Sequence, residues 1–215
     1  LELPMDDALI RYRMRLVPQS AMELRSLRGV WLRVGAGSFG TARHDAIFPG
    51  IEWVVGDEWS SGTDWFEHPE ALRVAPHPHK VSIPVMALSH QGTGIGLSWD
   101  PNQSALSHMT RIRCPQPVFA TPNFVDRMNH HLLGLMLPSA RWGLRENQLE
   151  ADPAVIVPRG TKLNLDATIS VVKGTSVDVV IDWVKRNGMP DPGAPRYGWG
   201  DALDRIARAY NTHLW

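Results

Sequence analysis

The sequence predicts a mainly β protein, an antiparallel β-sandwich followed by a short helical segment at the carboxyl end. Three observations favour this fold class. Apolar and polar residues alternate in short segments from residue 9 to residue 172. Glycine and proline separate these segments, as turns require. After Gly174 the apolar spacing changes from two residues to the three or four that are typical of a helix.

The strands follow from this alternation in chain order. Residues 9–17 alternate apolar side chains with three arginines, which predicts a strand with one face in solvent. Residues 30–34 repeat the pattern. Residues 81–89 and 94–100 are predicted to form a hairpin through HQGTG, whose glycines suit a tight turn. Pro84 lacks an amide donor, so we expect its strand at an edge or at a bulge. The other predicted strands are VFATP (118–122), HHLLGLML (130–137) and LNLDATISVV (163–172).

Two helices are predicted after the strands. Ser176 is the expected N-cap of the first helix, which Gly188 and Pro190 end. The second helix carries one apolar stripe, formed by Leu203, Ile206, Ala207 and Tyr210.

These elements divide the chain into two parts. We expect a β-sandwich domain over residues 1–175 and, over residues 176–215, a helical linker that begins a second helical domain. The chain starts without methionine and ends within an amphipathic helix, so we expect it to be a piece of a longer protein.

Bulk composition indicates a globular domain and argues against two kinds of partner. Hydrophobic residues make up 43% of the chain and charged residues 20%, which is enough for an ordinary core. Lys plus Arg and Asp plus Glu both number 22, so we expect neither nucleic acid nor an anionic membrane as partner. The single cysteine, Cys114, excludes an internal disulfide, and localisation stays open.

Motifs for a cofactor, a catalytic serine or a metal are incomplete. The stretch VGAGSFG (34–40) has the glycine spacing of a dinucleotide fingerprint, but a helix and a βαβ unit are missing. Ser38 lacks the strand–turn–helix setting of a nucleophile. His77 and His79 are spaced to share a metal, but no third ligand is indicated. We therefore expect no cofactor and no metal, and we assign no catalytic residue.

The stretch GIEWVVGDEWSSGTDWFE (50–67) is the strongest candidate for a binding site. We expect Trp53 to begin a strand and to pack in the core, and the later residues to form a loop. An indole stacks well on the C–H face of a sugar, and carboxylates accept hydrogen bonds from its hydroxyls. The predicted carbohydrate-binding residues are Asp57, Glu58, Trp59, Asp64 and Trp65. The alternative is that the tryptophans form the small core of a long loop while the acids stay solvated.

Strands through residue 172, helices from residue 176 and the stretch FPGIEWVVGDEWSSG together resemble a known arrangement. The chain is similar to the N-terminal β-supersandwich, of galactose-mutarotase-like fold, that precedes an (α/α) toroid in large bacterial glycoside hydrolases. The resemblance is architectural and covers roughly residues 1–175. It implies a sandwich that packs on the toroid and contributes a loop to the sugar cleft, with the catalytic carboxylates beyond Trp215. Mutarotases themselves use a glutamate and histidines, a set that this sequence does not match.

The expected function is therefore a non-catalytic, carbohydrate-associated module of a larger carbohydrate-active enzyme. Its expected partners are a carbohydrate and a missing C-terminal helical domain of the same chain. Two alternatives stay open: a stand-alone sugar-acting enzyme (an aldose epimerase or a glycosidase), or a purely structural interdomain module. The structural alternative predicts exposed apolar surface on the terminal helices.

Overall fold

The chain forms two units. The computed structural model describes residues 8–35, 42–60, 73–103, 114–140, 143–189 and 198–214. One unit is Leu1–Lys185 and the other is Arg186–Trp215, so the compact first unit runs past residue 175. Among the described residues, the helices are too short or too polar to cross a lipid bilayer.

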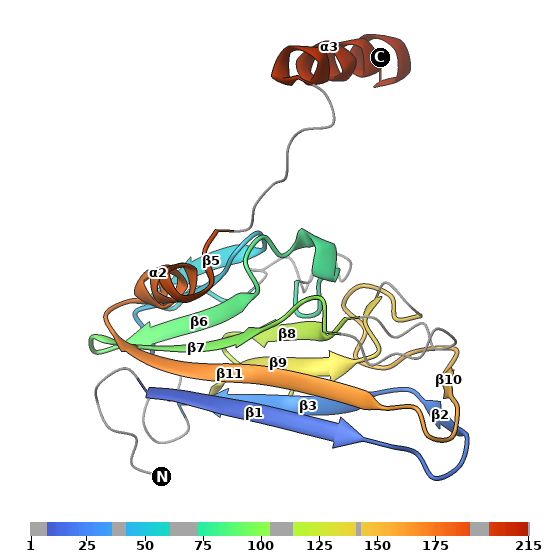
Figure 1. Cartoon of the computed structure of the whole chain (residues 1–215). Helices are drawn as coiled ribbons and strands as arrows, with labels where there is room; N and C mark the ends of the chain where they lie inside the picture. Colours follow the sequence, from blue (N-terminus) through green and yellow to red (C-terminus); the bar gives the residue numbers. More distant parts are fainter. Residues whose placement is uncertain are drawn as a thin grey trace. The chain divides into compact units, whose positions relative to one another are not determined.

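Antiparallel sheets build the first unit (Figure 1). A six-stranded sheet has the order β1-β11-β7-β6-β4-β5, a three-stranded sheet the order β3-β9-β8, and β10 pairs with β2. The bounds are Ala8–Leu16 (β1), Met22–Leu24 (β2), Leu27–Val34 (β3), Asp45–Phe48 (β4), Glu52–Val55 (β5), Val85–His90 (β6), Thr93–Trp99 (β7), Gln116–Ala120 (β8), His131–Leu137 (β9), Val155–Val157 (β10) and Leu163–Lys173 (β11). These pairings are all antiparallel, which confirms the predicted mainly β fold.

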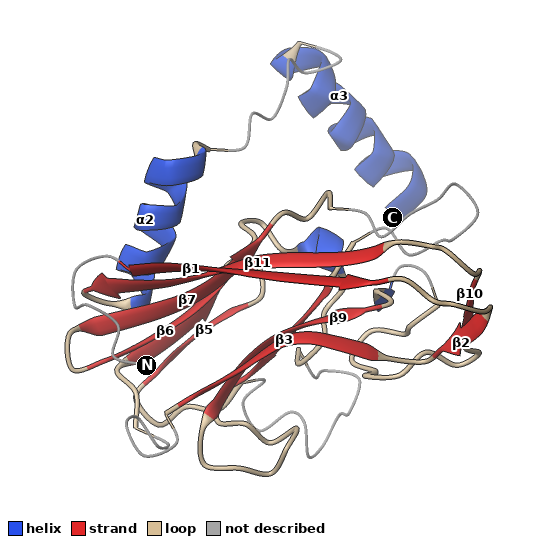
Figure 2. Ribbon diagram, turned by 60° about the horizontal axis from the view of Figure 1, so that its bottom comes forward, coloured by secondary structure: helices blue, strands red, loops and turns tan. Residues whose placement is uncertain are grey.

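The main core lies between the two larger sheets, which form separate layers in Figure 2. The ring centroid of Phe48 on β4 is 6.3 Å from that of Trp99 and 5.6 Å from that of Phe119 on the facing sheet. Fully buried members of this core include Met86, Leu88, Leu97, Leu133, Leu135 and Leu165. Alternate residues of each strand supply it, as the two-residue period requires.

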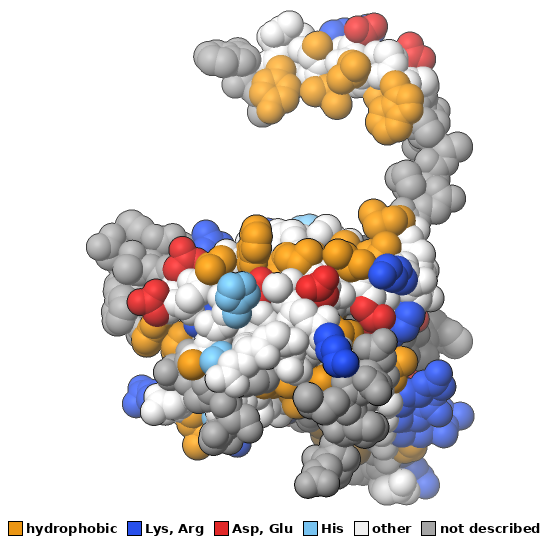
Figure 3. Space-filling view, turned by 90° about the vertical axis from the view of Figure 1, so that its left-hand side faces the viewer, with side chains coloured by type: hydrophobic (Ala, Val, Ile, Leu, Met, Phe, Trp, Pro, Cys, Tyr) orange, Lys and Arg blue, Asp and Glu red, His pale blue; other side chains and the backbone are white. Residues whose placement is uncertain are grey.

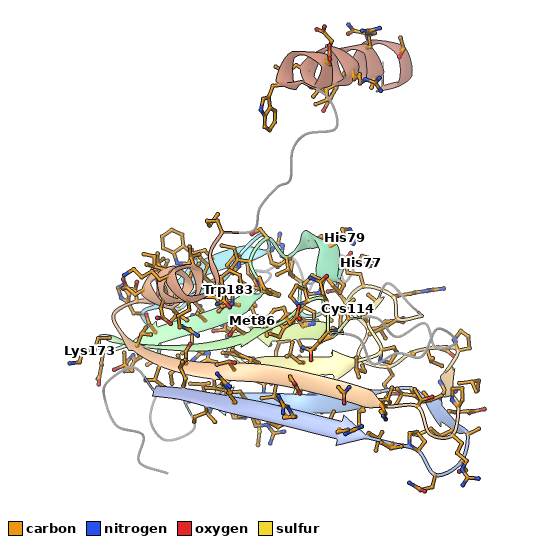
Figure 4. All side chains as sticks on the ribbon, in the orientation of Figure 1. His77, His79, Met86, Cys114, Lys173 and Trp183 are labelled. Carbon is orange, nitrogen blue, oxygen red and sulfur yellow. The ribbon has the colours of Figure 1, made fainter. Side chains whose placement is uncertain are left out.

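Helix α2 (Ser176–Asn187) covers part of the outer face of the six-stranded sheet. Its buried Val179 packs with Val85, Ala87 and Val172, and Trp183 lies at the margin of this cluster (Figure 4). The helix comes close because β7 offers glycine. A Cβ at Gly94 would lie 2.7 Å from a Val179 methyl group, and one at Gly96 would meet the other.

The start of α2 corrects one expectation. Ser176 lies within the helix, and Thr175 precedes it as the cap, so the predicted N-cap was wrong by one residue. The backbone N–H and the hydroxyl of Thr175 donate to Asp178 Oδ2 at 2.7 and 2.9 Å. The backbone N–H of Ser176 donates instead to Asp45 Oδ1 at 3.1 Å.

The hairpin between β6 and β7 is confirmed, and the role of Pro84 is corrected. Gln91 and Gly92 have φ values of 48° and 74°, as the two central residues of a tight hairpin require. Pro84 was expected to mark an edge or a bulge, but β6 begins one residue later and lies between β4 and β7. The missing amide donor therefore falls outside the strand.

The second unit contains α3 (Trp199–Ala209), followed by one turn of π-helix (Tyr210–Leu214). Hydrophobic side chains lie along one side of α3 (Figure 3). Three residues of α3 and Tyr210, which follows it, are exposed: Trp199 by 73%, Leu203 by 65%, Ile206 by 55% and Tyr210 by 55%. Among the described residues of this helix, none is buried.

Candidate functional site

The aromatic and acidic stretch begins on an edge strand of the six-stranded sheet. Trp53 on β5 is opposite Ile47 in the register, so its side chain is on the face that α2 partly covers. Among the described strands β5 is the last of its sheet, and the indole is 58% exposed. The expectation that Trp53 packs in the core was therefore wrong. The strand prediction for this residue is confirmed.

A hydrogen-bonded turn follows β5. Gly56 has a φ of 59°, and its N–H donates to the carbonyl of His44 at 2.9 Å. Glu58 closes the turn twice, since its carboxylate accepts the Val55 N–H at 2.7 Å and its own N–H donates to the Val55 carbonyl at 3.2 Å. Trp59 comes directly after this turn and is 43% exposed.

Ser60 anchors the chain beyond the turn to Thr121, the residue directly after β8. Its backbone N–H donates to the Thr121 carbonyl at 2.9 Å, and its hydroxyl accepts the Thr121 N–H at 3.1 Å. Ser60 is fully buried. Trp59 is therefore presented between two fixed points of the backbone.

Arg43 is a buried cation behind the acidic turn, and the sequence did not point to it. The residue is only 7% exposed, and its Nε and Nη2 have no hydrogen-bond partner among the described residues. Burial lowers the pKa of the guanidinium, and the negative charges of Glu58 and Asp57 oppose this shift. Two of the three predicted sugar-binding carboxylates, Asp57 and Glu58, therefore lie in the electrostatic field of a buried positive charge.

Asp45 joins four elements of the same region and is also a residue that the sequence did not single out. It is 3% exposed, and its carboxylate accepts hydrogen bonds from the Ser89 hydroxyl, the Ser176 N–H and the Trp53 indole N–H. Burial raises its pKa, but these hydrogen bonds outweigh burial and hold the pKa below its ordinary value. The bond to Trp53, at 3.3 Å, fixes the orientation of the exposed indole.

Two adjacent histidines lie inside the molecule. His131 on β9 is fully buried, and its Nδ1 is 2.8 Å from the Thr121 hydroxyl. Burial, with Arg43 and His130 nearby, lowers the pKa of His131 to about 4, so the ring is neutral at pH 7. His130 is 4% exposed and has its Nδ1 3.2 Å from the amide nitrogen of Asn123. Neither ring is placed to meet a ligand at the surface.

His77 and His79, the predicted candidates for a shared metal, lie at a short 3₁₀ turn, Pro78–Lys80 (Figure 4). Their rings stack with centroids 5.1 Å apart. The nearby Glu146 carboxylate is 2.8 Å from the Lys80 ammonium and also accepts the His77 backbone N–H at 3.1 Å. Its charge is thus already balanced. The described residues contain no group of three or more ligands suited to a metal ion.

The structure places three of the five predicted sugar-binding residues in and directly after one turn. Asp57, Glu58 and Trp59 are consecutive and exposed. Asp64 and Trp65 lie outside the described residues, as does Ser38 with most of the glycine-rich stretch. No family model matches the chain, and neither a curated protein nor a solved structure does. Any functional argument therefore depends on the chemistry of the turn itself.

Proposed function

We propose that this chain is a non-catalytic, carbohydrate-binding β-sandwich module of a larger carbohydrate-active enzyme. One observation carries the proposal: Trp59 is 43% exposed on a backbone segment held at both ends, with Asp57 and Glu58 beside it. A flat apolar ring with adjacent hydrogen-bond acceptors matches a sugar, which has an apolar C–H face and hydroxyl groups.

The rigidity of the turn supports binding rather than simple solvation. A site whose side chains are already fixed loses less conformational entropy when a ligand binds. The carboxylate of Glu58 uses one oxygen to accept the Val55 N–H, so its other oxygen is the one available to a hydroxyl. Asp57 is exposed and adds further acceptor capacity. The acidic charge favours a neutral sugar over an anionic one at this turn.

The larger enzyme in the proposal supplies the chemistry. The architectural resemblance to the sandwich domain of toroid-containing glycoside hydrolases supports a role in sugar binding for this chain and a catalytic role for another domain of the larger enzyme. The His131 ring is fully buried and held by Thr121, so it is not offered to a substrate as an acid or base. The proposal assigns no catalytic residue to this chain.

Calorimetric titration with a panel of neutral mono- and oligosaccharides tests the proposal. We expect Trp59→Ala to weaken binding by about two- to tenfold, the usual contribution of one aromatic contact. Trp199→Ala is the matched control, because that indole is 73% exposed on α3, in the other unit, and should not alter affinity. Absence of binding by the unaltered chain to every sugar would refute the proposal.

A second function, that of a structural interdomain module, is favoured by the apolar stripe on α3. Four exposed hydrophobic residues on one side of a helix are typical of a surface that packs against another element. In this proposal the stripe contacts further helices of the same chain. A chain shortened after Gly188 should then lose binding of a hydrophobic dye such as anilinonaphthalene sulfonate. Equal dye binding by the two chains would count against this role.

A further inference from the structure

A row of exposed arginines occupies the outer face of β1. Arg11, Arg13 and Arg15 alternate with the partly buried residues of this strand, so all three project to the same side. Alternate residues of an antiparallel strand are roughly 7 Å apart. The row therefore displays three positive charges over about 14 Å of a flat strand.

The neighbouring strand leaves most of this charge unbalanced. In the register between β1 and β11, Thr168, Asp166 and Asn164 are opposite the three arginines. Arg13 pairs with Asp166 at 3.1 Å, but Arg11 and Arg15 face a hydroxyl and an amide. These strands have no other acidic residue on their outward positions.

Lys162, exposed directly before β11, adds a fourth cation to this region. Figure 3 shows Lys and Arg side chains gathered on the side of the molecule where β1 lies. The whole chain has a formal net charge of +0, so positive charge is concentrated on this face and is not in excess over the chain as a whole. Charged side chains protect an edge strand from pairing, but that protection does not require a row of one sign.

We propose that this basic face, formed by Arg11, Arg13 and Arg15 with Asn164 and Thr168, binds an anionic polysaccharide. The guanidinium groups pair with carboxylate or sulfate groups along the polymer, and guanidinium suits both because it offers several donors in one plane. The amide of Asn164 and the hydroxyl of Thr168 are suited to bind sugar hydroxyls between the charges.

The chemistry of the face favours a glycan over a nucleic acid. Single-stranded nucleic acids are bound through aromatic side chains on which the bases stack. The outward positions of β1 and β11 carry no aromatic ring. This inference goes beyond the proposed function, because β1 and β5 are the opposite edges of the six-stranded sheet and the neutral-sugar turn follows β5.

Binding to polygalacturonate and dextran sulfate tests the inference directly. The probes are titrated into the full chain at about 50 mM and about 500 mM salt, the lower of which screens exposed charges much less than the higher. Neutral dextran and a single-stranded oligonucleotide serve as comparison polymers. We expect binding to at least one of the two anionic glycans at low salt, loss of binding at high salt and no binding of dextran.

The variant Arg11→Gln/Arg15→Gln should weaken binding at least about fivefold, since two exposed ion pairs are lost. The control Arg145→Gln/Arg208→Gln removes the same charge from exposed positions elsewhere and should have little effect. Thermal unfolding checks that both variants are folded.

Four results would overturn the inference: no binding of either anionic glycan, an equal loss in the control, tighter binding of the oligonucleotide, or salt-sensitive self-association of the chain in place of polymer binding. Each outcome is independent of whether neutral sugars bind at Trp59.

Discussion

Asp45 shows at the residue scale how one buried carboxylate organises the candidate site. It accepts hydrogen bonds from Ser89, Ser176 and Trp53, which lie on three different elements. Asp45→Ala should lower the free energy of unfolding by about 2–4 kcal/mol, because three donors lose a charged acceptor in a buried place. Asp45→Asn should cost less, because one acceptor oxygen stays.

Urea unfolding measures these losses of stability. Glu150→Gln removes a negative charge from an exposed position and should change the stability by less than about 0.5 kcal/mol. A value for Asp45→Ala as small as that of the control would show that the carboxylate is not a structural centre.

His131 gives a prediction about the pH dependence of stability. Its folded-state pKa of about 4 lies below the ordinary value of 6.5, so the unfolded chain binds the proton first as the pH falls. The associated stability is complete above pH 6.5 and is lost between 6.5 and about 4, by about 3 kcal/mol in total. The free energy of unfolding should therefore change less with pH in this range for His131→Gln than for the unaltered chain. Parallel pH profiles would contradict the assignment.

Single residues also show what the sequence could and could not predict about the site. The local sequence pointed to Asp57, Glu58 and Trp59, together with Asp64 and Trp65, because indoles beside acids form a recognisable chemical pattern. Arg43 and Asp45 carry no such pattern. Their importance comes from burial, which for Asp45 depends on β5, β6 and α2 packing around it. The residues next to them in the sequence do not reveal this burial. Trp53 was misplaced because an edge position depends on strand order rather than on local pattern.

At the scale of elements, the packing of α2 on the sheet depends on glycine. Gly96→Ala should lower the free energy of unfolding by about 1–3 kcal/mol, since the new methyl group would meet a Val179 side chain that is fully buried. Val179→Ala removes the methyl groups that the new Cβ would meet. We therefore expect the loss of unfolding free energy in Gly96→Ala/Val179→Ala to be smaller than the sum of the losses in the two single variants. Chemical unfolding of the four proteins in this cycle measures the coupling. Additive effects would contradict the close approach.

Periodicity predicted the long elements well and the short ones poorly. The alternation in residues 9–17 and 163–172 gave β1 and β11, and helical spacing gave α2, because both signals extend over many residues. Strands β2, β4 and β10 are three or four residues long and were not predicted. In three or four residues, an alternation of apolar and polar side chains cannot be told apart from chance. Such strands form because neighbouring strands supply hydrogen bonds, which is tertiary information.

At the scale of the whole molecule, the hydrophobic clusters of the described residues belong to the first unit. Within the part of the chain that the structure describes, these clusters contain no residue beyond Trp183. A chain shortened after Gly188 should therefore melt within about 2 °C of the full chain, since a change of 1 kcal/mol corresponds to about 2–4 °C in proteins of this size. Differential scanning calorimetry measures the shift. A large fall in melting temperature would show that the two units stabilise each other.

The two edges of the six-stranded sheet differ in one further respect. The β1 edge carries Arg11, Arg13 and Arg15, whereas Glu52, Asp57 and Glu58 belong to the β5 edge and the turn after it. Six strands at roughly 4.8 Å spacing separate these charges by about 24 Å, so the exposed charges at the two edges of the sheet have opposite sign. The first unit should therefore approach a charged polymer or surface in a preferred orientation, with its β1 edge first when the target is negative.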